Sequence, residues 1–200
     1  MIETIVKSLQ ETEVSLKNLL ANQDTLKSIS EAACVMIECL ESQRKGRIFT
    51  VGNGGSATQA SHLAEELTGR YRHDRQPLAA MAIGDLGHIT CVANDFGYEY
   101  IFSRFLEALG RSGDVLVALS TSGSSENVLK AADRSKSMGM KVVSLVGKHD
   151  TPLGKLSDVS IVTPGGQYSD RIQELHLMVI HILVELIEKE LIYKGSKDVH

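Results

Sequence analysis

The chain has 200 residues, 42% of them hydrophobic, with a formal net charge of −4 and a pI near 6.0. This length and apolar fraction suit one α/β domain with a helical extension, and the absence of a long basic run gives no electrostatic case for nucleic-acid binding. Acidic residues near the start and the lack of an apolar run of about 20 residues predict a cytoplasmic protein without signal peptide or membrane span.

The first 43 residues are predicted to be helical, in two segments that each carry an apolar stripe. The first stripe contains Ile5, Leu9, Leu16 and Leu20, and the second runs from Leu26 to Leu40. The break falls at Asn22–Asp24, with Asp24 as the expected N-cap of the second helix. These helices have no strand of their own to cover, which favours a subunit interface and a homo-oligomer. The alternative is that they pack on their own sheet.

After Gly46 the pattern alternates between apolar runs and amphipathic segments. The expected strands are Arg47–Val51, Leu78–Ile83, Val115–Leu119, Lys141–Val146 and Val159–Val162. The expected helices are Ser56–Thr68, His88–Asn94, Tyr98–Leu109, Glu126–Met138 and Asp170–Tyr193. Nearly continuous apolar runs at every strand but the first indicate burial on both faces of a parallel sheet.

This alternation predicts an α/β fold, a five-stranded parallel sheet with right-handed crossovers in a flavodoxin-like three-layer sandwich. We treat residues 1–200 as one domain. In it, residues 1–45 are helices at an oligomer interface, and residues 46–193 form the α/β core and the long C-terminal helix. Ligands of such sheets bind beyond the carboxyl ends of the strands.

The three cysteines, Cys34, Cys39 and Cys91, are too few and too scattered for a disulfide framework or a cysteine zinc site. Each has apolar neighbours in the sequence. We therefore expect three buried thiols in a reducing compartment.

Two polar loops follow predicted strands. The run Ser120–Ser125 offers five hydroxyls around one glycine, whereas an ordinary N-cap needs only one, so it predicts a phosphate site at a helix N-terminus. The run has no lysine and is not a Walker loop. The loop Gly52–Ser56 lacks the third glycine of a dinucleotide fingerprint, so we expect Asn53 and Ser56 to contact sugar hydroxyls or phosphate.

His62 and Glu66 are four residues apart on a predicted helix and share one face. Spacing alone suits a surface hydrogen bond, but the position just past the glycine loop favours a metal site or proton chemistry. Glu65 lies about 100° further around the helix and is expected to face solvent or a neighbouring subunit.

The last predicted helix carries further polar candidates. His181 lies in an apolar stretch, where a histidine is most often a core or interface residue. Gln173 and His181 are about 12 Å apart along a helix axis, so both reach one ion only at full stretch or from different subunits.

Five separated segments occur in an order that resembles the phosphoheptose isomerases of the sugar-isomerase (SIS) superfamily. They are GNGGS, His62–Tyr71, Ala93–Arg104, Gly113–Val128 and Asp170–Glu188. The resemblance runs to about residue 190. One departure is Ala57–Thr58, where other members carry larger or polar residues.

The resemblance implies conversion of sedoheptulose 7-phosphate to D-glycero-D-manno-heptose 7-phosphate through an enediol, the first step toward activated heptose for lipopolysaccharide core or other surface glycans. It implies Glu66 as the base and His181 as its acid/base partner. It also implies one Zn²⁺ per subunit, no redox cofactor, and a homotetramer with sites between subunits. The implied metal ligands are His62, Glu66, Gln173 and His181. The implied substrate-binding and other active-site positions are Asn53, Gly54, Gly55, Ser56, Arg70, Asn94, Asp95, Ser120, Thr121, Ser122, Ser125, Asp170 and Gln173.

Three alternatives stay open at the level of sequence. If Glu66 and His181 both bind zinc tightly, neither can carry a proton, so either the metal is displaced or loosely held in turnover or one role is misassigned. A second alternative is an inactive SIS-type tetramer that binds the replication initiator, against which the intact His62, Glu66 and His181 argue. A third keeps the chemistry and changes the sugar phosphate.

Overall fold

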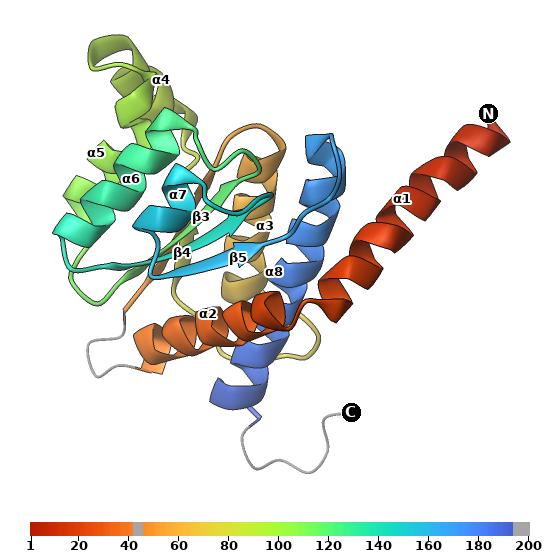
Figure 1. The fold of residues 1–200 in the computed structure, drawn as a ribbon. Helices are drawn as coiled ribbons and strands as arrows, with labels where there is room; N and C mark the ends of the chain where they lie inside the picture. The colour runs from red at the N-terminus through yellow and green to blue at the C-terminus, as the bar shows by residue number, and fades with distance from the viewer. Residues whose placement is uncertain (42–45, 194–200) are drawn as a thin grey trace.

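A computed structural model of the protein describes residues 1–41 and 46–193. Its centre is a five-stranded parallel sheet in the order β2-β1-β3-β4-β5 (Figure 1). The strands are β1 (Ile48–Gly52), β2 (Ala80–Ala82), β3 (Val115–Ser120), β4 (Lys141–Val146) and β5 (Val159–Val162). This order is that of flavodoxin-like folds, so the predicted fold class is confirmed.

Helices cover both faces of the sheet, as Figure 1 shows. They are α1 (Ile2–Ala21), α2 (Gln23–Glu41), α3 (Gly55–Thr68), α4 (Leu86–Asp95), the 3-10 turn η1 (Tyr98–Tyr100), α5 (Ile101–Leu109), α6 (Glu126–Ser137), α7 (Pro152–Leu156) and α8 (Ser169–Leu191). Helices α2, α3 and α8 pack on one face, and α4 to α7 pack on the other.

The alternation of side chains along each strand divides the core in two. In β3, for example, Val117 and Leu119 join the cluster under α2, α3 and α8, while Leu116 and Ala118 join the cluster under α4 to α7. Both faces of the central strands are therefore covered by apolar side chains. The polar loops lie at the carboxyl edge of the sheet.

The prediction of burial on both faces was wrong for the edge strand β2. It has only three residues, and Met81 is 42% exposed, because β2 pairs with β1 on one side only. Helix α7 was not predicted, because its five residues are too few to show periodicity.

The predicted cap of α2 was also wrong. The Oδ1 atom of Asn22, not Asp24, accepts a hydrogen bond from the backbone N–H of Thr25 at 3.1 Å. Since α2 begins at Gln23, Asn22 holds the N-cap position and Asp24 lies in the first turn. The predicted helical residues 42 and 43 lie outside the described part of the chain.

The cysteines differ from one another in burial. Cys39 is buried, and burial raises the pKa of its thiol to about 11, as predicted. Cys34 and Cys91 are exposed, so the prediction was wrong for both. Apolar neighbours along the sequence do not place a residue on the buried side of a helix, because successive helical residues point about 100° apart.

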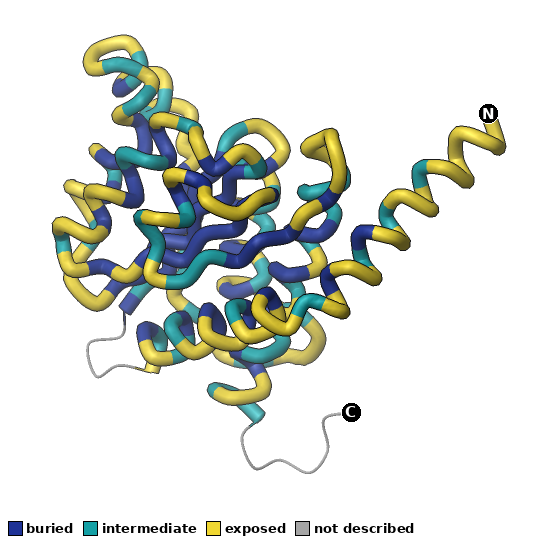
Figure 2. Tube along the Cα trace, in the orientation of Figure 1, coloured by how far each residue is buried: buried dark blue, intermediate teal, exposed yellow. Residues whose placement is uncertain are grey.

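Helix α1 extends away from the body of the molecule, and most of its surface is exposed (Figures 1 and 2). Only Ser15 and Leu19 are buried, while Ile5 and Leu9 of the predicted stripe are 58% and 67% exposed. The alternative that the first two helices cover their own sheet is therefore confirmed for α2 and wrong for α1 in the single chain. None of the helices in the described residues is long and apolar enough to cross a membrane.

Candidate active site and metal centre

The two polar loops leave adjacent strands at the same edge of the sheet. Gly52, the last residue of β1, pairs with Leu119 of β3, and each strand is followed directly by its loop. This confirms the predicted position beyond the carboxyl ends of the strands. Gly54 has φ of +54°, a conformation that residues with a Cβ rarely adopt, and it turns the chain into α3.

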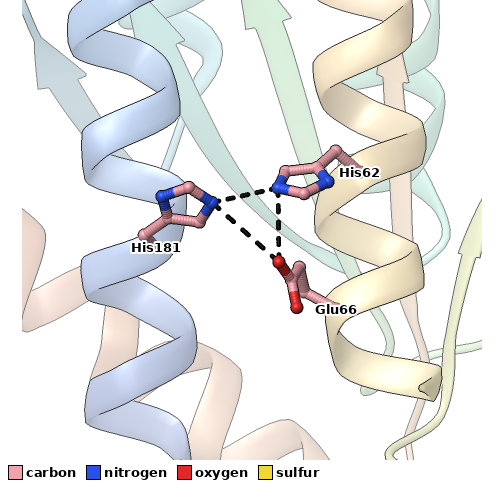
Figure 3. Close-up of side chains that lie close together, drawn as sticks. All are labelled: His62, Glu66 and His181. Carbon is pink, nitrogen blue, oxygen red and sulfur yellow. Dashed lines mark hydrogen bonds and ion pairs between the residues drawn. The ribbon is translucent and has the colours of Figure 1, made fainter. Parts of the chain in front are cut away.

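Three titratable side chains meet between α3 and α8 (Figure 3). His62 Nε2 lies 3.3 Å from Glu66 Oε1 on the same helix face and 3.0 Å from His181 Nε2 on α8. His181 Nε2 lies 3.9 Å from the same Glu66 oxygen. The side chains are 35%, 14% and 38% exposed, respectively, so the cluster is half-buried and open to a ligand.

This donor set fits a zinc ion. Three atoms bound tetrahedrally at about 2.1 Å from one ion lie about 3.4 Å from each other, and imidazole nitrogen with carboxylate oxygen is a common zinc donor set. The observed separations of 3.0 to 3.9 Å fall around that value. In the residues that the structure describes, His62, Glu66 and His181 are the group of this kind that could hold a metal.

Glu65 belongs to the surroundings of this cluster. Its Oε2 lies 3.4 Å from His62 Nδ1, although the side chain is 63% exposed. A carboxylate beside the outer nitrogen of a ligating histidine fixes the tautomer that presents Nε2 to a metal. The expectation that Glu65 faces solvent is confirmed by its exposure. The contact with His62 was not predicted, although a three-residue offset leaves two helical side chains as neighbours.

Tyr71 is a second contact that the sequence analysis did not single out. Its ring centroid lies 5.9 Å from that of His181, with the planes tilted by 31°. The aromatic face therefore limits the orientations of the imidazole. The contact joins the segment after α3 to α8, which no local spacing could reveal. The His181 side chain is 38% exposed, so the expectation from apolar context that it is a core residue was wrong, whereas a place at a subunit interface stays a prediction.

Gln173 lines a cavity together with His62. The cavity has a volume of about 360 Å³, and its other lining residues are Gly55, Thr58, Gln59 and Leu177. The Gln173 amide lies over Gly55, where a Cβ would come within 2.7 Å of Nε2 and would displace the end of the Gln173 side chain. Direct ligation by Gln173 stays a prediction.

In the Ser120–Ser125 loop, serine hydroxyls lie within hydrogen-bond distance of one another. Ser120 Oγ lies 3.3 Å from Ser125 Oγ and accepts a hydrogen bond from the backbone N–H of Gly123 at 3.1 Å. Ser125 holds the N-cap position of α6, yet its side chain makes no capping hydrogen bond. The Ser125 hydroxyl is therefore not used to cap α6, which favours a phosphate site over an ordinary N-cap turn.

A pair of amides joins the two loops. Asn53 Nδ2 donates to Asn127 Oδ1 at 2.8 Å, and Asn127 Nδ2 donates back to Asn53 Oδ1 at 2.9 Å. The Tyr98 hydroxyl lies 3.0 Å from the same Asn53 oxygen. Asn127 is buried. Asn127 was not among the predicted site residues. Its place two residues after the serine loop is the feature of the sequence that could have indicated it.

Other predicted site residues lie apart from the cluster in the single chain. Asn94 and Asp95 are exposed on α4, which packs on the opposite face of the sheet from α8, and Asn94 Nδ2 donates to Asp95 Oδ1 at 2.7 Å. Arg70 and Asp170 are also exposed. Ser56 is only 4% exposed, in the first turn of α3. Their roles toward a substrate stay predictions.

Known proteins match this chain over almost its whole length. The SIS domain family matches residues 9–147. Phosphoheptose isomerases of Yersinia enterocolitica and Cytophaga hutchinsonii are 47% and 50% identical over 193 residues, covering 96% of this chain and 99% and 100% of theirs. The chain belongs to the phosphoheptose isomerase family. The structure of a phosphoheptose isomerase from Francisella tularensis superposes with a TM-score of 0.86 at 32% identity, covering 95% of this chain and 100% of that one.

Proposed function

We propose that this protein converts sedoheptulose 7-phosphate to D-glycero-D-manno-heptose 7-phosphate, an aldose–ketose isomerisation at the start of activated-heptose biosynthesis. The observation that carries the proposal is the His62–Glu66–His181 cluster, two members of which lie on the helix that begins at the Gly52–Ser56 loop. Membership of the phosphoheptose isomerase family supplies the seven-carbon sugar phosphate. The intact cluster gives no support to an inactive tetramer that binds the replication initiator.

The reaction moves one proton between neighbouring carbons and needs a base, a donor and no redox cofactor. The Glu66 carboxylate removes a proton from C1 of the ketose while the C2 carbonyl oxygen gains one, which gives the enediol. His181 serves the two oxygens, supplying the proton to O2 and accepting the one from O1. Return of the carbon-bound proton to C2 gives the aldose, so atoms and charge balance.

The loop Ser120–Ser125 binds the phosphate in this proposal, with Thr121, Ser122 and Ser125 as hydrogen-bond donors. Phosphate binding far from the reacting carbons positions C1 and C2 against Glu66. Asn53 is hydrogen-bonded to Asn127 near the serine loop, and Gln173 lines a cavity with His62. In this proposal both side chains contact the sugar hydroxyls. A phosphorylated sugar is charged and does not cross membranes, which supports a cytoplasmic location for the enzyme.

The residues that would hold zinc are His62, Glu66 and His181, with Gln173 as the fourth candidate. A bound zinc ion would polarise the substrate oxygens as a Lewis acid. Because the Glu66 carboxylate cannot ligate tightly and take a proton at once, the proposal requires a loosely held or displaced ion during turnover.

The test is proton NMR of sedoheptulose 7-phosphate in D₂O with the purified protein, before and after chelation and with zinc restored. We expect aldoheptose 7-phosphate with deuterium at C2, since the abstracted proton exchanges with solvent. Absence of product and of exchange under all three conditions, from folded protein, would overturn the proposal and return attention to another sugar phosphate.

The proposal includes a homotetramer with sites completed between subunits. Support comes from the uncovered apolar stripe of α1 and from three predicted site residues that are exposed in the single chain, Arg70, Asp95 and Asp170. We expect Leu9→Glu to reduce the assembled mass in light scattering, whereas Asn18→Glu, at an exposed polar position of the same helix, leaves it unchanged. A monomeric wild-type protein would contradict the proposal.

A further inference from the structure

Arg75 and Glu188 form an ion pair in the interior of the protein. Arg75 Nε lies 2.6 Å from Glu188 Oε1, and the two side chains are 0% and 3% exposed. Arg75 belongs to the segment between α3 and β2, which has no helix or strand of its own, and Glu188 lies near the end of α8. A buried ion pair is weak evidence for stability, because desolvation of both charges opposes their attraction.

The guanidinium also holds the end of α3. Arg75 Nη2 donates to the carbonyl of Glu66 at 2.6 Å, and Nη1 donates to the carbonyls of Leu67 and Gly69 at 2.8 and 3.1 Å. The last carbonyls of a helix have no partner within it, and a positive charge there complements the helix dipole. One side chain thus closes the C-terminus of the helix that carries His62 and Glu66.

The other end of the ion pair lies on the helix that carries His181. Glu188 follows His181 by seven residues, which is close to two full turns, so both side chains lie on nearly the same face of α8. The Glu66 carbonyl and the Glu188 carboxylate therefore bind one planar group. That group connects α3 and α8 next to the point where His62, Glu66 and His181 meet.

We infer that Arg75, together with Glu188, is a positioning residue that sets the spacing of α3 and α8 and thereby the separations of the three cluster atoms. Arg75 contacts neither substrate nor metal and acts through Glu66 and His181. The consequence for turnover rests on the proposed function, whereas the consequence for metal binding rests on the cluster alone.

The experiment compares Arg75→Lys and Glu188→Gln with Glu185→Gln. Glu185 is a matched control, because it lies on the same helix and pairs with Arg72 of the same segment at 3.0 Å, but these side chains are 28% and 55% exposed rather than buried. Zinc affinity is measured by competition with a chromophoric chelator, without substrate. Kinetics of the ketose phosphate give kcat and KM separately.

We expect Arg75→Lys and Glu188→Gln to weaken zinc binding by about 10- to 100-fold, the range seen when groups that orient metal ligands are removed. We expect kcat to fall with little change in KM, since the serine loop is untouched, and Glu185→Gln to match the wild type. Wild-type zinc affinity and kcat in folded Arg75→Lys would overturn the inference.

The double variant Arg75→Met/Glu188→Leu separates positioning from stability if a single variant fails to fold. Apolar replacement of both partners of a buried pair often preserves stability. We expect this variant to be folded and weak in zinc binding. Wild-type zinc affinity in it would overturn the inference. If the wild type binds zinc but does not isomerise the sugar, the proposed function fails, and the shift in zinc affinity still decides the role of Arg75.

Discussion

The cluster between α3 and α8 and the Ser120–Ser125 loop after β3 are held by different means. His62 and His181 are 119 residues apart in the chain, and their contact depends on how two helices pack. The serine hydroxyls contact one another within six residues, mostly through the loop's own hydrogen bonds.

This difference predicts how substitutions in the cluster and in the loop affect catalysis and binding. The cluster contains the titratable groups, so it suits proton transfer and metal binding, and it depends on distant contacts such as that of Arg75. The loop contains neutral donors near a helix N-terminus, so it suits an anion. Losses in the cluster should therefore lower kcat and metal affinity, while losses in the loop should raise KM.

The largest expected effect is that of Glu66→Gln, which keeps the shape of the side chain and removes the base. We expect kcat to fall by about 10²- to 10⁴-fold, the usual contribution of a positioned general base. His181→Gln should lower kcat in the same way. The measurement is steady-state kinetics with circular dichroism to show an intact fold.

Glu65→Gln is the matched control, since Glu65 contacts only the outer nitrogen of His62 in this cluster. Its effect should be smaller, about tenfold, as for a group that orients a metal ligand. Equal losses of kcat in the two glutamate variants, or wild-type turnover in Glu66→Gln, would contradict the assigned roles.

The next effect concerns the loop. Ser122→Ala and Thr121→Val each remove a hydroxyl donor to a charged phosphate, worth about 1.5–3 kcal/mol. We expect kcat/KM to fall by about 10- to 100-fold and inhibition by inorganic phosphate to weaken, while zinc affinity stays at the wild-type value. A loss of zinc affinity in these variants would show that the loop and the cluster are not separate units.

A smaller effect is expected where the two loops join. Asn127→Ala leaves the half-buried amide of Asn53 without its reciprocal partner, and an unsatisfied buried group costs about 1–3 kcal/mol, so the cost here lies toward the lower end. We expect lower stability in urea and a reduced kcat/KM. Tyr98→Phe removes only one exposed donor to the same oxygen and should cost less. Equal costs would show that Asn127 is not the residue that fixes Asn53.

The last effect is on stability alone. Burial lowers the pKa of His176 on α8 to about 4, opposed in part by the backbone carbonyl of Val146. The unfolded imidazole takes up a proton below about pH 6.5 and the folded one only near pH 4, so stability is full above about 6.5 and falls by roughly 3 kcal/mol as the pH drops to 4. His176→Leu should flatten this part of the curve in urea unfolding. Parallel curves for variant and wild type would exclude His176 as the cause.

Much of the fold could be predicted because it is periodic. The apolar runs gave five strands close to their observed bounds, and the i, i+4 spacing placed His62 and Glu66 on one face of α3. Glycine beside strand ends located both loops. These features depend on neighbours in the chain and on the geometry of a helix or a strand.

The sequence by itself determined the parallel sheet, the two loops and one half of the cluster. The family resemblance implied that His181 belongs with His62 and Glu66, and the tertiary structure brings the three side chains together. Only the tertiary structure decided that Tyr71 and Glu65 support the cluster and that Arg75 joins α3 to α8. It also decided that Cys34 and Cys91 are exposed and that the stripe of α1 is uncovered in the single chain. The reason is physical: periodicity fixes which residues share a face, but packing between elements far apart in the chain decides what that face meets.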